Sequence, residues 1–112
     1  MSSLITTHIL DTAAGQPAEG VAVELHARNG AAWAQIASGT TDAQGRVKDL
    51  GPAALPAGNY QLRFDTGAYF ATTNTETFFP EVSLTFAVRE GQAHYHVPLL
   101  LSPFAYSTYR GN

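Results

Sequence analysis

Apolar and polar residues alternate with a period of two through most of this sequence, and turn-forming residues interrupt the alternation about every 8–12 residues. A period of two places successive side chains on opposite faces of a β-strand. The pattern covers residues 4–10, 21–28, 33–38, 60–65, 82–89 and 94–101, with a last short strand expected over 106–110 and a short helix over 66–72. The sequence therefore predicts an all-β fold, a two-sheet antiparallel β-sandwich of about seven to eight strands with one short helix.

The same alternation carries predictions about single positions. His26 lies on the polar side of segment 21–28, so we expect its ring to face solvent. The turn residues Glu90 and Gly91 separate segments 82–89 and 94–101, which we expect to pair as a β-hairpin. Arg46 follows the turn at residues 41–45, which places it at a loop-to-strand junction.

Segment 94–101 differs from the other strands because both of its faces carry apolar residues. Tyr95, Val97, Leu99 and Leu101 share one face, and His94, His96, Pro98 and Leu100 share the other. A two-layer sandwich buries one face of each sheet, so we expect a partner subunit over the second face, in a symmetric dimer or a dimer of dimers. The alternative is a loop of the same chain over Pro98 and Leu100. Because Pro98 has no N–H group, we expect the strand to be bulged or near a sheet edge there.

Length, composition and charge limit the possible classes of function. The 112 residues fit one domain over residues 1–112, and 45% hydrophobic with 13% charged residues is typical of a globular chain. A net charge of −3 without a run of Lys or Arg argues against nucleic-acid binding. The lack of cysteine excludes disulfides and thiolate nucleophiles. With no leader-like or long apolar segment, we expect no membrane association and a cytoplasmic location.

Three histidines, His8, His94 and His96, lie on strands with partly apolar faces and are candidates for chemistry. A neutral imidazole there could take a proton from water and return it to a leaving group. The three rings could instead form a zinc site, or each could be an ordinary hydrogen-bonded surface or interface histidine. Arg46 could bind a planar ligand or a developing oxyanion, or it could form a surface salt bridge.

Other catalytic patterns do not occur in the sequence. The G-x-S-x-G motif of serine hydrolases is missing, which argues against a Ser-His-Asp triad. Phosphate-binding glycine loops and dinucleotide fingerprints are also missing. The sequence therefore implies no organic cofactor.

Five sequence blocks cover nearly the whole chain: THILDTAAGQPAEGVAVEL at 7–25, DAQGRV at 42–47, GNYQLRFDTGAYF at 58–70, FFPEVSLTF at 78–86 and HYHVPLLLSPFAYSTYRGN at 94–112. Together they resemble the hydroxyisourate hydrolases of the transthyretin-like family. Transthyretin itself has a similar SPYSYST-type ending but lacks the paired histidines and the YRG terminus. The resemblance therefore favours the enzyme branch over the hormone carrier.

The resemblance implies hydrolysis of 5-hydroxyisourate to 2-oxo-4-hydroxy-4-carboxy-5-ureidoimidazoline in urate catabolism, by a homotetramer of two stacked dimers with sites between subunits. The family's catalytic positions fall on His8, Arg46 and His96, where the histidines would activate water and Arg46 would stabilise the oxyanion. The expected substrate-binding residues are Leu10, Pro98, Leu100, Ser107, Tyr109 and Asn112. The resemblance implies no metal and no cofactor, and it gives His94 no clear role.

One position departs from the family pattern, which usually ends YRGS, whereas this chain has Asn112 after Gly111. An amide donates and accepts hydrogen bonds but does not shuttle protons readily, so we expect activity to be retained at a reduced level. Three other functions stay open at this point. They are a non-catalytic carrier of a small aromatic ligand, a metal-dependent hydrolase built on His8, His94 and His96, and an adhesion-type interaction module.

Overall fold

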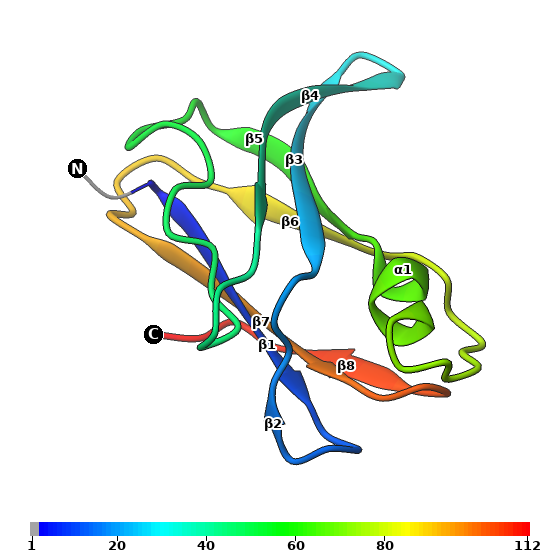
Figure 1. The fold of residues 1–112 in the computed structure, drawn as a ribbon. Coiled ribbons are helices and arrows are strands. Elements are labelled where there is room, and N and C mark those ends of the chain that lie inside the picture. The colour runs from blue at the N-terminus through cyan, green and yellow to red at the C-terminus, as the bar shows by residue number, and fades with distance from the viewer. Residues whose placement is uncertain (1–2) are drawn as a thin grey trace.

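Eight strands and one helix follow one another in the computed structural model, which describes residues 3–112 (Figure 1). Met1 and Ser2 lie outside the described residues. They begin the N-terminal segment for which we expected no leader. The elements are β1 (Ile5–Asp11), β2 (Gln16–Pro17), β3 (Ala22–Asn29), β4 (Ala32–Thr40), β5 (Gly58–Phe64), α1 (Thr66–Ala71), β6 (Val82–Val88), β7 (Tyr95–Leu101) and β8 (Tyr106–Thr108).

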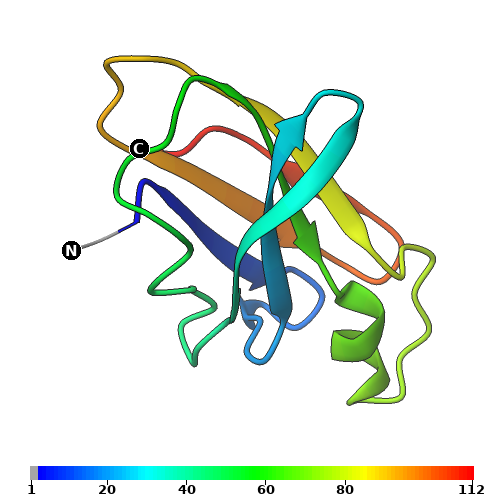
Figure 2. The same cartoon turned by 90° about the horizontal axis from the view of Figure 1, so that it is seen from above.

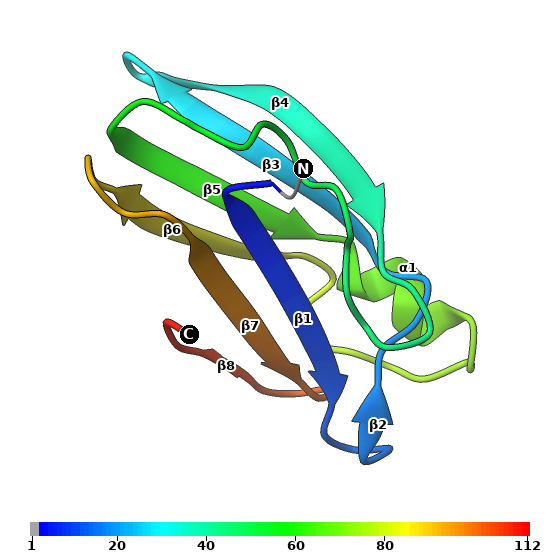
Figure 3. The same cartoon turned by 90° about the vertical axis from the view of Figure 1, so that its left-hand side faces the viewer.

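The strands form two four-stranded sheets that lie one over the other (Figures 2 and 3). The strand order is β2-β1-β7-β8 in one sheet and β4-β3-β5-β6 in the other. Neighbouring strands are antiparallel, except that β1 and β7 run parallel. The predicted two-sheet β-sandwich with one short helix is confirmed, and the parallel pair is a feature that the alternation did not indicate.

Alternating apolar side chains of both sheets fill the space between the layers. The fully buried members include Ile5, Ile9, Leu99 and Leu101 from the first sheet and Val23, Leu25, Leu62 and Phe64 from the second. Burial of a side chain of this size contributes about 1.5–3 kcal/mol. The core therefore sets the register of β1 and β7, and it leaves the residues between the buried ones facing outward.

Helix α1 lies at one end of the sandwich. The Asp65 carboxylate accepts a hydrogen bond from the backbone N–H of Ala68 at 3.1 Å and caps the first turn. Phe70 is buried in the core, and the Gly67 N–H donates to the Pro80 carbonyl at 2.8 Å. Tertiary packing thus stabilises a six-residue helix whose sequence has weak intrinsic preference for one.

The predicted hairpin between segments 82–89 and 94–101 is wrong. β6 is an edge strand of one sheet and β7 is an inner strand of the other, so residues 89–94 cross between the layers. The Tyr95 hydroxyl holds this crossing, because it accepts from the Arg89 N–H at 2.8 Å and lies 3.3 Å from the Arg89 carbonyl oxygen. A turn sequence shows that the chain reverses, but it does not show which sheet receives the next strand.

The predicted exposure of His26 is also wrong, because the residue is only 6% exposed. It lies in the inner strand β3, opposite Gln35 of β4 and Gln61 of β5, beside a register shift in the β3–β4 ladder. Its Nε2 atom lies 2.8 Å from Oε1 of Glu24. His26 is thus buried at an inner-strand position beside a register shift, although alternation alone assigns it to the solvent face.

Pro98 lies where the ladder between β7 and the edge strand β8 is interrupted. The pairing with β1 runs through Pro98 without a bulge, whereas the β8 ladder ends at Leu99 opposite Thr108 and the next bridge joins His96 to Gly111. The Pro98 carbonyl accepts a hydrogen bond from the Thr108 hydroxyl at 2.7 Å. The missing N–H group thus falls next to the sheet edge, as we expected from the sequence.

Within residues 3–112, the structure holds no helix with the length and apolar character needed to cross a membrane.

Candidate active site

The outward face of the β2-β1-β7-β8 sheet collects most of the candidate residues in rows. Three rows cross β1 and β7: Thr6 with His96, His8 with Pro98, and Leu10 with Leu100. The last row continues into β8 through Ser107, which lies opposite Leu100. The parallel pairing of β1 with β7 therefore brings together residues from the two ends of the sequence.

The loop after β4 brings Arg46 to this face. The Asp42 carboxylate accepts hydrogen bonds from the backbone N–H groups two and four residues later, at 2.9 and 3.0 Å, and closes a tight turn. The Gly45 carbonyl accepts from the Ile9 N–H at 2.8 Å, so Arg46 pairs with His8 in a single antiparallel bridge. A Cβ atom at Gly45 would lie 2.5 Å from the Ile9 carbonyl oxygen, and φ at this position is +77°, so the approach requires glycine.

The segment after β8 closes another side of the site. The Gly111 N–H donates to the His96 carbonyl at 2.8 Å. The Arg110 guanidinium carbon lies 4.8 Å from the centre of the Tyr95 ring, and its Nη2 donates to Gln92 Oε1 at 3.1 Å. These contacts hold the C-terminal segment against β7.

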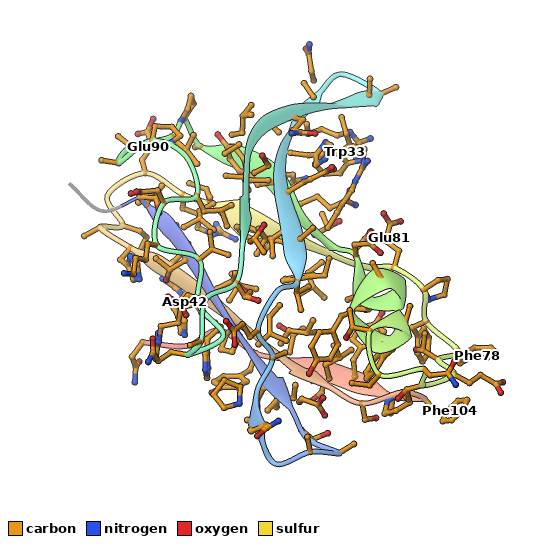
Figure 4. The ribbon with its side chains drawn as sticks, viewed as in Figure 1. Trp33, Asp42, Phe78, Glu81, Glu90 and Phe104 are labelled. Atoms are coloured by element: carbon orange, nitrogen blue, oxygen red, sulfur yellow. The ribbon has the colours of Figure 1, made fainter. Side chains whose placement is uncertain are left out.

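β1, β7, the loop after β4 and the C-terminal segment line an open hollow of about 560 Å³. Its lining includes the predicted residues Arg46, His96 and Asn112, and also Thr6, His94, Asp42 and Lys48. Figure 4 labels Asp42 where the loop crosses β1, far from Phe78 and Phe104 at the α1 end. Pockets of about 300–1,000 Å³ are typical for small-molecule ligands, so the hollow is large enough for one heterocyclic substrate.

The Thr6 side chain connects two histidines of the site. Its hydroxyl oxygen lies 2.9 Å from Nδ1 of His96 and 3.0 Å from Nε2 of His94. Because Nδ1 of His96 is occupied by Thr6, Nε2 is the ring nitrogen left for a ligand. His96 is half-buried and His94 is exposed.

The surroundings of His96 keep its imidazole neutral. Burial is the largest cause that lowers the pKa of His96 below its usual 6.5, and the positive charges of Arg46, His94 and His8 lower it further. A backbone hydrogen bond with Thr6 acts in the opposite direction without reversing the shift. A neutral imidazole is the form that can accept a proton from water.

The guanidinium of Arg46 is available to a ligand. Hydrogen bonds from backbone N–H groups, first from Arg46, lower the pKa of the neighbouring Asp42 carboxyl, so that group is ionised near neutral pH. Even so, no carboxylate within residues 3–112 forms an ion pair with the Arg46 side chain. The surface salt bridge that we kept as an alternative is therefore not formed in this part of the chain.

The remaining predicted residues lie on the same outward face but outside this hollow. Leu100 and Ser107 line a separate depression of about 280 Å³ beside β8, and Tyr109 lines another of about 350 Å³ together with His96. His8 and Leu10 are half-buried on β1, and Pro98 of β7 is buried within the single chain. In the single chain, Arg46, His96 and Asn112 are brought together, with His8 beside them at the bridge to Arg46.

The alternative of a three-histidine metal site gains no support. Within the part of the chain that the structure describes, no group of three or more His, Cys, Asp or Glu side chains is arranged to hold a metal ion. His94 and His96 both direct a nitrogen to the Thr6 hydroxyl. Each ring is therefore hydrogen-bonded to Thr6 and is not arranged around a common metal position.

Sequence reasoning missed Thr6 and Gly111 as parts of the site. Thr6 was detectable, because it alternates in phase with His8 on β1. The role of Gly111 was not detectable from spacing, since it depends on the bridge to His96 across two segments. Lys48 also lines the hollow, and the sequence offers no signal that separates it from an ordinary surface lysine.

Comparisons with known proteins agree with this fold. Residues 5–111 match the family model described as the HIUase/Transthyretin family. A 5-hydroxyisourate hydrolase of Salmonella typhi is 47% identical over 99% of this chain and 82% of that protein. The structure of Klebsiella pneumoniae 5-hydroxyisourate hydrolase superposes with a TM-score of 0.87 at 41% identity, covering 98% of this chain and 100% of that one. Sea bream transthyretin in complex with thyroxine gives a TM-score of 0.91 at 37% identity, covering 96% and 94%. The family predicted from the sequence is confirmed, and the chain belongs to the HIUase/Transthyretin family.

Proposed function

We propose that this protein hydrolyses 5-hydroxyisourate to 2-oxo-4-hydroxy-4-carboxy-5-ureidoimidazoline, a step of urate catabolism. The observation that carries the proposal is the neutral His96 ring in one hollow with the Arg46 cation. A base for water and a cation for the oxyanion are the two groups that hydrolysis of a ring amide needs. Relatives named 5-hydroxyisourate hydrolase, in Salmonella typhi at 47% and in mouse at 40% identity, support it.

The reaction adds one water molecule across a ring amide. The water oxygen bonds to the carbonyl carbon while one water proton passes to Nε2 of His96. The Arg46 guanidinium stabilises the negative charge that forms on the carbonyl oxygen. The C–N bond then breaks and the His96 imidazolium gives its proton to the leaving nitrogen, so the ring ends neutral and the product carries a new carboxyl group.

The other predicted residues orient the reactants. His8 lies beside Arg46 across the bridge between β1 and the loop, where its ring can hold the attacking water or the leaving nitrogen. The Asn112 amide at the rim of the hollow can donate and accept hydrogen bonds with the substrate. Leu10, Leu100, Ser107 and Tyr109 form the accessible part of the outward face, on which the substrate and a facing subunit would pack, and the buried Pro98 supports it from beneath Gly111.

We also propose that the protein assembles as a homotetramer, a dimer of dimers. The edge strands β6 and β8 lie on the same side of the sandwich and share a depression of about 350 Å³ with a mainly apolar lining. Large aromatic side chains are exposed in the single chain, including Phe78 at 71% and Phe104 at 62%. Apolar surface of this kind is typical of protein interfaces. Sedimentation equilibrium would test the assembly, with a mass near four times 11.9 kDa expected and a monomer at micromolar concentration contradicting it.

A carrier of a small aromatic ligand is the second candidate function, because the sea bream transthyretin with bound thyroxine superposes so closely. The hollow described above favours the hydrolase, since a cation and a titratable ring contribute little to binding an apolar ligand. Thermal unfolding in the presence of thyroxine separates the two functions. A carrier is stabilised by ligand near its dissociation constant, and the hydrolase is not expected to be.

The direct test follows the ultraviolet absorbance of 5-hydroxyisourate, made in place from urate and urate oxidase, with and without the protein. We expect the protein to speed its decay, and both His96→Ala and Arg46→Gln to reduce that rate by about 10²–10⁴-fold. Arg28→Gln, at the far end of β3, is the matched control and should keep full activity. Equal decay with and without the protein would contradict the proposal, and loss of activity after exhaustive chelation would instead favour the metal-dependent alternative.

A single domain over residues 1–112 and a cytoplasmic location also stay proposals. Limited proteolysis, with no early cleavage between the sheets expected, tests the first. Fractionation of cells that express the protein from its own gene tests the second.

A further inference from the structure

The hydrogen bonds of the Thr6 hydroxyl raise a question that the proposed hydrolysis leaves open. The hydroxyl lies within hydrogen-bond distance of His96 Nδ1 and His94 Nε2, and it has only one proton to donate. Thr6 either donates to one histidine and accepts from the other, or accepts from both. Accepting from both leaves the hydroxyl proton without a partner among residues 3–112, so only the two arrangements in which Thr6 also donates use this proton. The direction of this short chain decides which nitrogen of His96 carries its proton.

Only one of the two directions leaves His96 able to act as a base. If His96 donates from Nδ1 to Thr6, and Thr6 donates to His94, then Nε2 of His96 has a free lone pair. If His94 donates to Thr6, and Thr6 donates to Nδ1 of His96, then Nε2 carries the proton and cannot accept another. Neutral imidazole has one N–H group, so the two arrangements exclude each other.

Two features of the site favour the first direction. The Thr6 backbone raises the pKa of His96, which is the effect of an acceptor beside a ring N–H group on the side that faces β1. Nδ1 is the nitrogen on that side, as its contact with the Thr6 hydroxyl shows. His96 and the Arg46 cation also line the same hollow, and a cation there favours a lone pair over an N–H group on the ring nitrogen that Thr6 leaves free.

We propose that Thr6 and His94 are positioning residues that hold His96 in its Nδ1–H tautomer, so that the Nε2 lone pair faces the hollow. This role rests on the proposed hydrolysis, in which Nε2 takes the proton of water. Thr6 contacts the base directly, and His94 acts through Thr6 by accepting its hydroxyl proton. The proposal gives His94, which the family pattern left without a role, a specific one.

The charged and titratable groups around His96 are identified, so the test can separate their effects. They are Arg46, Asp42 and Lys48 from the loop after β4, His8 from β1, and His94 just before β7. Tyr95, Tyr109 and Arg110 line a second depression with His96. Thr6→Val removes the hydroxyl while keeping the size and β-branching of the side chain, and it changes none of these charges. Thr6→Ser restores a hydroxyl, and Thr40→Val, at an exposed position of β4, is the matched control.

The primary measurement is a long-range ¹H–¹⁵N correlation spectrum of the histidine rings in the whole protein, above the pKa of His96. His96 is assigned by the signal that disappears in His96→Gln. We expect an unprotonated Nε2 in the wild type and in Thr6→Ser, and a large fraction of Nε2–H in Thr6→Val. His94→Ala, at an exposed position, should give a mixture of the two tautomers, and His94→Gln should restore part of the wild-type state because its amide oxygen can accept from Thr6.

Kinetics provide the second measurement. A net hydrogen bond corresponds to roughly a tenfold change in an equilibrium, so we expect kcat to fall about tenfold in Thr6→Val, with KM within twofold and recovery in Thr6→Ser. The loss should be the same across the alkaline pH range, because a proton on the wrong nitrogen is not removed by raising the pH moderately.

The outcomes distinguish this proposal from the proposed function. A protonated Nε2 in the wild type, or a Thr6→Val protein whose tautomer and kcat match the wild type, overturns the positioning role. If Thr6→Val does not fold, the His94→Ala spectrum decides, and an unchanged tautomer there overturns the role of His94. If the tautomers shift as expected while the wild type does not hydrolyse 5-hydroxyisourate, the positioning pair stands and the proposed reaction falls.

Discussion

Gly111 lies directly against the imidazole of His96, because a Cβ atom at position 111 would stand 2.6 Å from His96 Cδ2 and 3.3 Å from Cγ. Carbon atoms do not approach so closely, so any side chain at this position must displace the ring or lift the C-terminal segment. The Gly111 N–H also donates to the His96 carbonyl. The last residues of the chain thus position the ring that we propose as the base.

Gly111→Ala should therefore reduce hydrolysis of 5-hydroxyisourate by at least about tenfold, since small misplacements of a catalytic group have large effects on rate. Steady-state kinetics and thermal unfolding of the same variant are the measurements. Gly30→Ala is the control, because Gly30 has φ of +65° and open space around it. That control should lose about 1–2 kcal/mol of stability from backbone strain but keep its rate. Full activity in Gly111→Ala would show that the contact does not position the ring.

The lowered pKa of His96 predicts the acidic limb of the pH–rate profile. The active form is the neutral ring, so kcat/KM should rise through the pKa of His96, below 6.5, and be level at higher pH. Arg46→Gln removes one cause of the lowering and should move the pKa of His96 upward. A ¹H NMR titration of the His96 ring measures this directly, and an unchanged or lower pKa in Arg46→Gln contradicts the prediction.

The same shift has a consequence for stability. The pKa of His96 is lower in the folded chain than the usual 6.5, so below 6.5 the unfolded chain binds the proton more readily. The contribution of neutral His96 is present above 6.5 and is lost as the pH falls through the folded pKa. Urea unfolding between pH 7 and 5 should show a smaller loss of stability in His96→Gln than in the wild type.

Tyr69 and Asp11 form a buried contact that ties α1 to the end of β1. The Tyr69 hydroxyl donates to Asp11 Oδ2 at 2.7 Å, while Asp11 Oδ1 accepts from the backbone N–H groups of Ala13 and Ala14. Tyr69→Phe leaves a carboxylate oxygen of the 6%-exposed Asp11 without this donor, which should cost about 1–3 kcal/mol. Urea unfolding measures the change, and a Tyr69→Phe protein as stable as the wild type contradicts it.

Burial and then the Asp11 contact raise the pKa of Tyr69 to about 12. The folded value lies above the usual 10.0, so this contribution to stability is complete below pH 10 and is lost as the pH rises through about 12. At pH 11 the near-ultraviolet absorbance of phenolate should accordingly be smaller for the folded wild type than for an equimolar mixture of the Tyr69→Phe protein and free tyrosine. Equal signals would show that Tyr69 titrates as an ordinary exposed phenol.

Arg110 fastens the C-terminal segment through its contacts with the Tyr95 ring and Gln92. Arg110→Met keeps much of the side-chain volume but removes the cation, so we expect the segment to loosen and kcat/KM to fall about three- to tenfold. Arg28→Met is the matched control, because Arg28 lies 5.3 Å from the Trp33 ring at the far end of the sandwich. The prediction fails if both variants lose the same activity or neither loses any.

Most strand segments and the helix were predictable, because they depend on local patterns. The short strand β2 was instead expected to be a turn, and the strand expected after Arg46 is only an isolated bridge. Alternation in residues 4–10 and 94–101 identified which side chains point outward, so His8, Leu10, His96 and Leu100 were correctly assigned to outward faces. It could not show that β1 and β7 pair in parallel, or that β6 and β7 belong to different sheets. Strand pairing depends on contacts between distant segments, and a turn sequence such as Glu90-Gly91 is compatible with either connection.

The sequence by itself determined the two-layer β architecture, the faces of the strands except at His26 and, through its motifs, the family. Only the tertiary structure decided that Thr6 bridges two histidines, that Gly45 brings Arg46 beside His8, and that Gly111 packs on His96. The physical reason is that the alternation of apolar and polar residues within one strand already specifies which of its faces is buried. A hydrogen bond or a shifted pKa instead requires two groups a few ångströms apart, and their separation is set by the packing of the whole chain.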